Sequence, residues 1–345
     1  MMPAAVLNAQ PGERVLDLCA APGGKATQLA AACGGKGVLV ANEPDRKRAR
    51  VLAGNIERLG IPNAVVVSEL PERLSARWPE AFDAVLVDAP CSGEGMFRRD
   101  AAARDEWRAS APAGCAKRQT AILCEAAKMV APGGRLVYST CTYNQIENEG
   151  VVRGFCAAHP DFTPCDFSLS GLGSSINGML RVWPHRTRGD GQFAALFVRA
   201  GTHPCPEVRP VVDPAARAAE ARYRAEYAPF PPGSNPVLWG DVLYACPALA
   251  PPIDGLRVLA PGLALVRLFP GRTEPLHALA MAFTHDLPTA PLGEDAARAF
   301  LRGEAVPFAG ARWLVATHDT LPLGWGKASG GMLKNHLPKG LRRQS

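Results

Sequence analysis

Between residues 14 and 200, short apolar runs alternate with longer amphipathic stretches, and no other feature of the sequence restricts the fold as strongly. The runs are nearly continuous in apolar residues, which is typical of strands covered on both faces of a parallel sheet. We predict strands at 14–18, 37–42, 64–68, 83–89 and 135–140. We predict helices between them, near 24–32, 45–59, 113–130 and 145–158. The alternation therefore predicts an α/β domain with a doubly wound, Rossmann-like sheet.

The composition changes after residue 200, and this change suggests where the first domain ends. Two final apolar runs, 179–185 and 192–200, flank a turn-rich segment and predict an antiparallel hairpin at the edge of the sheet. We expect this domain to span 1–200, followed by a proline-rich linker at 201–220 and a C-terminal region at 221–345. In that region we predict a helix within 215–230, strands at 263–269 and 312–318, and helices near 274–283 and 294–302.

Several classes of protein are excluded by simple features of the chain. No apolar run approaches the ~18 residues that a membrane-spanning helix needs, and the N-terminus lacks the pattern of a signal peptide. The chain has no C-x-x-C pair, so we predict no metal site and expect most cysteines to be reduced core residues in the cytoplasm. The formal net charge of +6 mildly favours a polyanionic partner.

The loop after the first predicted strand is a candidate cofactor site. That strand ends at Asp17, and a run of small residues with two glycines leads to Lys25. Ligands of doubly wound sheets bind at the carboxyl ends of the strands, and Glu43 ends the next one, where a carboxylate can accept hydrogen bonds from ribose hydroxyls. The G-x-G-x-x-G fingerprint of dinucleotide sites is missing, because Ala20 and Ala21 stand where glycines are expected. This argues against a nicotinamide-dependent oxidoreductase, and an ordinary strand-to-helix turn is the remaining alternative.

Two cysteines and an acid stand at the ends of two further strands. Asp88 and Cys91 follow the fourth predicted strand, and Cys141 follows the fifth. A thiolate that adds to carbon 6 of cytosine makes carbon 5 nucleophilic enough to accept a methyl group, and cysteine is intrinsically reactive in this role. Asp88 could hydrogen-bond the base, and the second cysteine could assist elimination. Each cysteine taken alone could instead be an apolar core residue.

Four stretches make a resemblance specific. DLCAAPGGK, NEPDRKRA, FDAVLVDAPCSGEGMFR and YSTCTYNQIENE resemble the successive motifs of the RsmF/RsmB (Nop/Sun) family of RNA cytosine-5 methyltransferases. The resemblance implies a class I methyltransferase fold and S-adenosylmethionine as cofactor. It also implies that Cys141 is the nucleophile and that Cys91 assists product release. DNA cytosine methyltransferases attack with their Pro-Cys cysteine, so Cys91 stays open as an alternative nucleophile.

The same resemblance implies a set of cofactor contacts. They are Cys19, Ala20, Ala21, Pro22, Gly23, Gly24, Lys25, Glu43, Arg48 and Asp88. The family often carries an Asp near the adenine after the third strand, and Ser68, Glu69 and Leu70 replace it here. We therefore expect no adenine-binding acid at that place. Family members also usually carry a module before the first motif, so we expect this sequence to be a fragment or to start late.

The C-terminal part is similar to the PUA-like end of RsmF-type enzymes, from about residue 255. It ends in a basic cluster in which the aromatic Trp325 could stack on an unpaired base. The cluster comprises Lys327, Lys334, Lys339, Arg342 and Arg343. Arg46, Lys47 and Arg50, in contrast, are predicted as a merely solvated helix face. We predict an RNA partner, with ribosomal RNA or the small ribosomal subunit ahead of transfer RNA, and a monomeric enzyme. The rival from another class is a catalytically idle RNA-binding protein for ribosome assembly.

Overall fold

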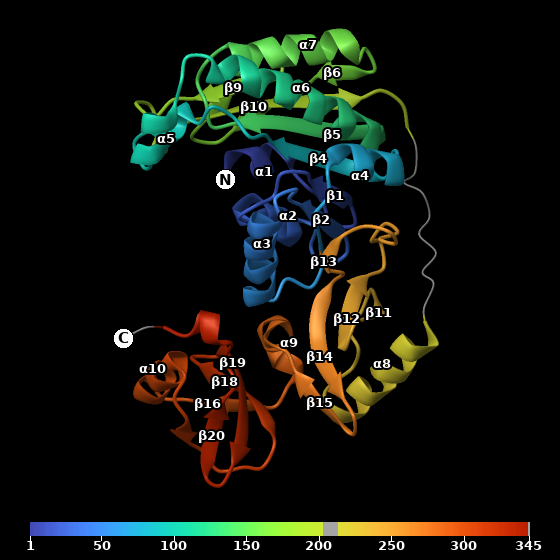
Figure 1. The fold of residues 1–345 in the computed structure, drawn as a ribbon, viewed down its shortest axis with the longest axis vertical. Coiled ribbons are helices and arrows are strands. Elements are labelled where there is room, and N and C mark those ends of the chain that lie inside the picture. The colour runs from blue at the N-terminus through green and yellow to red at the C-terminus, as the bar shows by residue number, and fades with distance from the viewer. Residues whose placement is uncertain (203–212, 344–345) are drawn as a thin grey trace. The chain divides into compact units, whose positions relative to one another are not determined.

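The computed structural model describes residues 1–202 and 213–343 (Figure 1). The chain divides into two compact units. The first unit comprises Met1–Leu52, Val66–Val208 and Leu249–Leu259, and the second comprises Ala53–Val65, Arg209–Ala248 and Ala260–Ser345. Half of the linker that we predicted at 201–220, residues 203–212, lies outside the described residues, and the predicted domain boundaries stay predictions.

The largest sheet confirms the predicted doubly wound core. Its order is β13-β3-β2-β1-β4-β5-β10-β6, with β9 also paired to β10. The strands are β1 (Arg14–Asp17), β2 (Val38–Asn42), β3 (Ala64–Val67), β4 (Phe82–Asp88), β5 (Val130–Thr140), β6 (Phe162–Pro164), β9 (Met179–Val182), β10 (Gln192–Arg199) and β13 (Val258–Ala260). The pairs β1–β2, β1–β4 and β4–β5 are parallel. Every residue of β1, β2 and β3 is buried, as expected of apolar runs covered on both faces.

The predicted hairpin is present at one edge of this sheet. Strand β10 pairs antiparallel with β5 on one side. On its other side it pairs antiparallel with both β9 and β6. At the opposite edge, β13 joins β3. The sequence did not predict β6, β13 or the small β7–β8 pair (Ser168–Leu169 and Gly173–Ser174).

Helices pack on both faces of the sheet in the first unit. They are α1 (Met2–Leu7), α2 (Gly24–Ala32), α3 (Arg46–Arg58), α4 (Pro71–Arg77), α6 (Ala111–Met129) and α7 (Val151–Ala158). A further helix, α5 (Ala101–Glu106), buries no residue and lies against the 3-10 turn at Glu94–Met96. Figure 1 shows α6 and α7 on one side of β5 and β10, with α1 on the other. A single π-helical turn at Ile146–Gly150 precedes α7, where we had predicted one continuous helix. Helices α1, α4 and α5 were not predicted.

The second unit contains two smaller sheets. One has the order β11-β12-β14-β15 and the other β16-β18-β19-β20-β17. Their strands are β11 (Ser234–Trp239), β12 (Val242–Pro247), β14 (Leu263–Phe269), β15 (Arg272–Pro275), β16 (Thr289–Pro291), β17 (Val306–Pro307), β18 (Trp313–His318), β19 (Leu321–Ser329) and β20 (Met332–Asn335). The helices are α8 (Pro214–Glu226), α9 (His277–Ala282) and α10 (Glu294–Arg302). The predicted helices and strands of this region are all present.

One prediction for the second unit is wrong. Trp325 is only 2% exposed and belongs to an apolar core cluster, so it is not available to stack on a base. Its indole nitrogen Nε1 donates to the carbonyl of Leu276 at 2.9 Å, and its ring meets that of Trp313 edge-on. The physical reason is packing: Trp325 faces the apolar cluster formed with β12, β14 and α9, whereas Lys327, two residues on and on the same face of β19, is exposed and lies over the ring of Trp313.

Within residues 1–202 and 213–343, every helix is too short or too polar to span a lipid bilayer. The same residues contain no cluster of three or more His, Cys, Asp or Glu side chains placed to hold a metal ion.

Candidate active site

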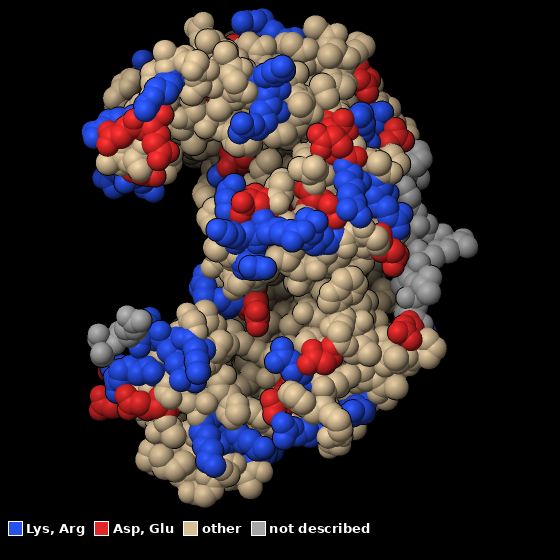
Figure 2. All heavy atoms as spheres, viewed as in Figure 1, with Lys and Arg blue, Asp and Glu red and all other residues tan. Residues whose placement is uncertain are grey.

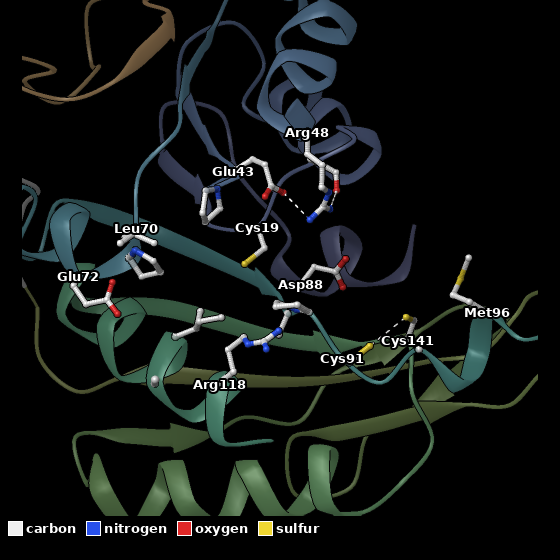
Figure 3. Close-up of a pocket in the computed structure, with 18 residues that line it drawn as sticks. Cys19, Glu43, Arg48, Leu70, Glu72, Asp88, Cys91, Met96, Arg118 and Cys141 are labelled. Carbon is white, nitrogen blue, oxygen red and sulfur yellow. Dashed lines mark hydrogen bonds and ion pairs between the residues drawn. The ribbon is translucent and has the colours of Figure 1, made fainter. Parts of the chain in front are cut away.

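A cavity of about 560 Å³ opens at the carboxyl ends of the central strands of the first unit (Figure 3). Seven of the side chains that we predicted for the site line it: Cys19, Ala21, Glu43, Arg48, Asp88, Cys91 and Cys141. Leu70, Pro71 and Ile122 add an apolar wall. The topology therefore brings the predicted cofactor loop and the predicted catalytic residues to a single cavity, as the strand-end rule for doubly wound sheets anticipates.

The remaining predicted cofactor residues form the loop between β1 and α2. Ala20 donates its backbone amide to Asn42 at 2.8 Å, which ties the loop to the end of β2. Gly23 has φ 117° and precedes the first turn of α2, a backbone conformation that L side chains rarely adopt. Lys25, two residues on, reaches back over the strand ends to Asp88. The glycine thus allows the sharp turn that places the lysine beside the cavity.

Glu43 is held at the cavity by hydrogen bonds to its own chain neighbourhood. Glu43 is only 3% exposed, and its carboxylate accepts the backbone amide of Asp45 at 3.1 Å and pairs with Arg48 at 3.1 Å. Arg48 also donates to the carbonyl of Ala21 at 2.9 Å, so it links the second strand end to the cofactor loop. The position suits a carboxylate that accepts hydrogen bonds from ribose hydroxyls.

Asp17 is a buried carboxylate for which the described residues supply no hydrogen bond of good geometry. It is fully buried at the end of β1, and neither of its oxygens has a partner among the described residues. Burial raises the pKa of Asp17 to about 7, and the negative charge of Asp88 adds to the shift, while Lys25 and the amide of Cys19 oppose it. An uncompensated buried acid is costly, so a cationic ligand at this end of the cavity would be favoured.

These residues fit S-adenosylmethionine. That molecule combines a ribose, an adenine and a methionine end with a cationic sulfonium. The cavity offers Glu43, Asp88 and an apolar wall, and the buried Asp17 lies near both acids. When bound, the cofactor supplies an electrophilic methyl group.

The two predicted catalytic cysteines lie in contact. Their Sγ atoms are 3.3 Å apart, and both side chains are half-buried at the cavity (Figure 3). The pKa of the Cys141 thiol is lowered, chiefly by a hydrogen bond from the thiol of Cys91 and also by the positive charge of Lys25, against the opposing effects of burial and Asp88. The same hydrogen bond, together with burial, raises the pKa of Cys91. The contact between the two sulfurs allows either thiol to donate. The directions of the two pKa shifts, with the positive charge of Lys25 near Cys141, favour Cys141 as the thiolate and Cys91 as its proton-bearing neighbour.

Asp88 is fixed beside the cysteines by three neighbours. Lys25 Nζ lies 2.7 Å from one of its carboxylate oxygens. The hydroxyl of Ser139 and the side-chain amide of Gln192 donate to the other. Sequence reasoning missed Ser139 and Gln192, and it assigned Lys25 to the cofactor alone. Ser139 could have been noticed, since it stands two residues before Cys141 at the end of the same strand.

A buried network, which the sequence did not reveal, joins the two cysteine loops. Glu147 is fully buried, and its carboxylate accepts hydrogen bonds from the amide of Ser92 and the side chains of Gln119 and Asn144, at 2.7–2.9 Å. Tyr138 donates to Gln119 at 2.9 Å, and burial raises the pKa of its hydroxyl. Because Ser92 follows Cys91 directly, this network holds the loop of Cys91 against the segment after Cys141.

The acid after β3 faces away from the cavity. Glu69 accepts the backbone amide of Arg257 at 2.7 Å and lies 3.5 Å from Arg73, while the next residue, Leu70, lines the cavity. The Glu69 carboxylate is thus engaged with the segment 249–259. Glu69 is therefore not available to the adenine side, and the acid that lines the cavity beside Leu70 is Glu72, in the first turn of α4.

Comparison with known proteins places the chain in a family. Residues 4–198 match the family described as 16S rRNA methyltransferase RsmB/F. Residues 222–283 match the first C-terminal domain of RsmF rRNA methyltransferase, and residues 288–343 match the RsmF PUA domain. Among solved structures, the chain is similar to NSun6 from Pyrococcus horikoshii with SFG, an S-adenosylmethionine analogue, at 30% identity and a TM-score of 0.51. That similarity covers 58% of this chain and 51% of that one.

Similar curated proteins extend over nearly the whole sequence. Ribosomal RNA small subunit methyltransferase F of Erwinia tasmaniensis is 33% identical over 99% of this chain and 77% of that protein. The protein of the same name from Klebsiella pneumoniae is 34% identical over 99% of this chain and 76% of its own length. The chain therefore belongs to the RsmB/F family of S-adenosylmethionine-dependent 16S rRNA methyltransferases.

Proposed function

We propose that this chain methylates carbon 5 of a cytosine in the RNA of the small ribosomal subunit, through a covalent intermediate with Cys141. The observation that carries the proposal is the contact of two thiols, 3.3 Å apart, beside the Lys25–Asp88 ion pair. Two cysteines in contact at a cofactor cavity have little use in binding alone. A pair in which one thiol stabilises the thiolate of the other suits covalent catalysis.

The first step is the addition of Cys141 to the base. Carbon 5 of cytosine attacks a methyl sulfonium poorly, because its electrons are held in the aromatic ring. A bond from the Cys141 thiolate to carbon 6 turns the ring into an enamine and makes carbon 5 nucleophilic. The hydrogen bond from Cys91 and the charge of Lys25 lower the pKa of Cys141, and so raise the fraction of thiolate at neutral pH.

Asp88 positions the base during this step. Its carboxylate is fixed by Lys25, Ser139 and Gln192, and it therefore presents a lone pair to the cavity without reorganising. A hydrogen bond from the exocyclic amine of the cytosine to Asp88 would orient carbon 6 towards the sulfur and favour the shift of electrons in the ring.

Release of the product requires that the bond between Cys141 and carbon 6 of the base be broken again. After carbon 5 has accepted the methyl group, its proton leaves to a base and the carbon 6–sulfur bond breaks, so that Cys141 departs as a thiolate. Cys91 keeps its proton because its pKa is raised, and its thiol can donate a hydrogen bond to the departing sulfur. This stabilises the leaving group, and we propose it as the role of Cys91.

The choice of RNA rests on the relatives and on the C-terminal region. The two relatives compared above are named ribosomal RNA small subunit methyltransferases, and residues 288–343 match a PUA domain. In that region the basic side chains are exposed, with Arg342 half-buried: Lys327, Lys334, Lys339, Arg342 and Arg343. Exposed cations of this kind can neutralise RNA phosphates. We keep the proposed division into a methyltransferase domain at 1–200 and an RNA-binding region at 221–345, with the segment 249–259 of the latter packed in the first unit. The monomeric state and the cytoplasmic location stay predictions.

Single substitutions of the two cysteines test the proposal. Incubation with S-adenosylmethionine and a transcript of small-subunit ribosomal RNA should give no methylation and no adduct with Cys141→Ala. Cys91→Ala should form the adduct and fail to release it, so that a protein–RNA complex survives denaturing electrophoresis. Cys156→Ala, which removes a half-buried thiol of α7 away from the cavity, is the matched control and should behave as wild type.

Two other outcomes would contradict the proposal in different ways. An adduct trapped by Cys141→Ala and absent with Cys91→Ala would reverse the two roles. Methylation that persists in both variants would exclude covalent catalysis, and both cysteines would then be core residues.

A further inference from the structure

A second cavity of the first unit, of about 180 Å³, is lined by three arginines. Its walls are Arg46, Arg50, Ser68, Arg257 and Leu259. It shares none of these residues with the cofactor cavity. We call it the arginine pocket.

The arginines converge from two distant parts of the chain. Arg46 and Arg50 are four residues apart on α3 and therefore lie on the same face of that helix, one turn apart. Arg257 belongs to the segment 249–259, where its backbone amide donates to Glu69 and its carbonyl accepts the amide of Ser68. A guanidinium nitrogen of Arg257 also donates to the carbonyl of Ser68 at 3.0 Å. The third arginine is thus held in place by the backbone that follows β3.

The pocket has a surplus of positive charge. In the part of the chain that the structure describes, neither Arg46 nor Arg50 forms an ion pair, and no carboxylate lines the pocket. The nearest acids along the chain are engaged elsewhere. Asp45 accepts the backbone amides of Lys47 and Arg48, and Glu69 binds Arg73 and the amide of Arg257.

Like charges on one helix face repel, so they are poorly explained by the stability of the fold. Figure 2 shows basic side chains gathered over α3. Guanidinium groups bind phosphate through paired N–H donors, and three of them around one cavity surround an anion from several directions. The fit is to a single tetrahedral oxyanion in the pocket rather than to a peptide carboxylate, which would satisfy one guanidinium only.

We propose that the arginine pocket binds one phosphate of the RNA backbone and so helps to fix the substrate on the methyltransferase unit. RNA as the source of the phosphate rests on the proposed function. The sequence predicted a solvated helix face of Arg46, Lys47 and Arg50, and all three are exposed; the proposal adds a ligand for Arg46 and Arg50 to that interpretation. In this arrangement Arg46, Arg50 and Arg257 hold one phosphate between them and do not act as three independent charges.

The salt dependence of RNA binding tests this directly. Binding of a small-subunit ribosomal RNA transcript is measured over a series of KCl concentrations for wild type, Arg46→Ala, Arg50→Ala and the double variant. Each phosphate contact contributes roughly 0.7–0.9 to the slope of log affinity against log salt. Each single variant should therefore lower the slope by about that amount, and the double variant should lower it no further, because both arginines hold the same phosphate.

Lys47→Ala is the matched control. Lys47 stands on the same helix, carries the same charge and does not line the pocket. It should leave the slope unchanged. The affinity for S-adenosylmethionine, measured by calorimetry, should be unchanged in all four variants. This control verifies that α3 is folded and that Arg48 of the same helix keeps its place at the cofactor cavity. Unaltered slopes in Arg46→Ala and Arg50→Ala would overturn the proposal. The proposal would also be overturned if Lys47→Ala lowered the salt slope by the same amount, or if the double variant lowered it twice as much as each single variant. Both results are expected of independent surface charges that share no phosphate.

The assay separates this proposal from the proposed function. Wild-type enzyme that forms 5-methylcytosine while the arginine variants keep their slopes would overturn the arginine pocket alone. Wild-type enzyme that forms no 5-methylcytosine while the variants lose slope would overturn the reaction and leave the pocket standing.

Discussion

Gly95 offers a sharp test of how tightly the nucleophile is positioned. Its backbone amide donates to the carbonyl of Cys141 at 2.8 Å, so the loop of Cys91 rests directly on the backbone of the other cysteine. A Cβ at residue 95 would lie 2.5 Å from that carbonyl oxygen and 3.0 Å from the carbonyl oxygen of Asp190. Gly95 does not have a positive φ, so alanine is allowed by its backbone and the conflict is purely steric.

The size of the effect follows from the displacement. An ordinary contact begins at about 3.4 Å, so the Cys141 carbonyl and the new Cβ must separate by 3.4 − 2.5 = 0.9 Å. A misplacement of about 1 Å at a reacting group can cost ~10²-fold in rate, or ~2.7 kcal/mol of activation free energy. Overpacking of this kind typically costs ~1–3 kcal/mol of stability. We therefore expect Gly95→Ala to fold, bind cofactor and lose about two orders of magnitude in kcat.

The assay is single-turnover methylation of a small-subunit ribosomal RNA transcript. Gly114→Ala is the matched control, because a Cβ at that position of α6 meets nothing within 4 Å. It should keep the wild-type rate and gain up to about 1 kcal/mol of stability from the better helix propensity of alanine. A wild-type kcat in Gly95→Ala, with unchanged cofactor affinity, would refute the view that the two cysteine loops are held tightly against each other.

Three further substitutions test individual interactions of the site. Glu43→Ala should weaken S-adenosylmethionine binding by ~1–3 kcal/mol through loss of charge-assisted hydrogen bonds, and an unchanged calorimetric affinity would remove Glu43 from the cofactor site. Glu147→Gln keeps the shape of the side chain but places an NH₂ group against one of the three hydrogen-bond donors. The free energy of unfolding, measured with denaturant, should therefore fall by ~1.5–3 kcal/mol, and an unchanged value would mean that the buried network contributes little to stability. Asp17 has a folded-state pKa of about 7 against 3.8 for the free side chain, so the cofactor-free protein should lose stability, by at most about 4 kcal/mol, as pH rises through this interval. Asp17→Asn should flatten that dependence, and an unchanged pH profile would contradict it.

Much of the central sheet could be predicted because its strands are short and apolar throughout. The exception is β5, which starts at Val130 and not at Arg135. Pro132, Gly133 and Gly134 have the composition of a turn, yet the strand passes through them with an irregular register opposite Phe82 and Ala84. Gly133 has φ 81°, and a Cβ at Gly134 would lie 2.8 Å from the carbonyl of Asp83. Glycines there permit a bulge within the strand, and composition alone cannot distinguish such a bulge from a turn.

The residues of the candidate site also fall into those that the sequence predicts and those that it does not. Asp88, Cys91, Cys141 and Glu43 could be predicted because each follows a recognisable strand, and strand ends meet at one edge. Glu147 could not, because it is polar in sequence and becomes a fully buried acceptor only when its segment docks against Gln119 of α6 and the Cys91 loop.

The segment 249–259 illustrates why the order of the chain does not give the boundaries of its compact parts. Its composition is rich in proline, so we had taken it for part of the C-terminal region, yet it belongs to the first unit. Arg257 and Glu69 are 188 residues apart and share a hydrogen bond, and the buried indole of Trp78 donates to the carbonyl of Pro252 at 2.8 Å. These contacts satisfy polar groups that would otherwise be costly to bury beside α4. The sequence around each partner does not predict these hydrogen bonds, because each segment taken alone has the composition of an ordinary loop or helix. The role of Glu69 is therefore visible only in the folded structure, where it accepts the backbone amide of Arg257 in the segment 249–259. This hydrogen bond fixes one wall of the arginine pocket.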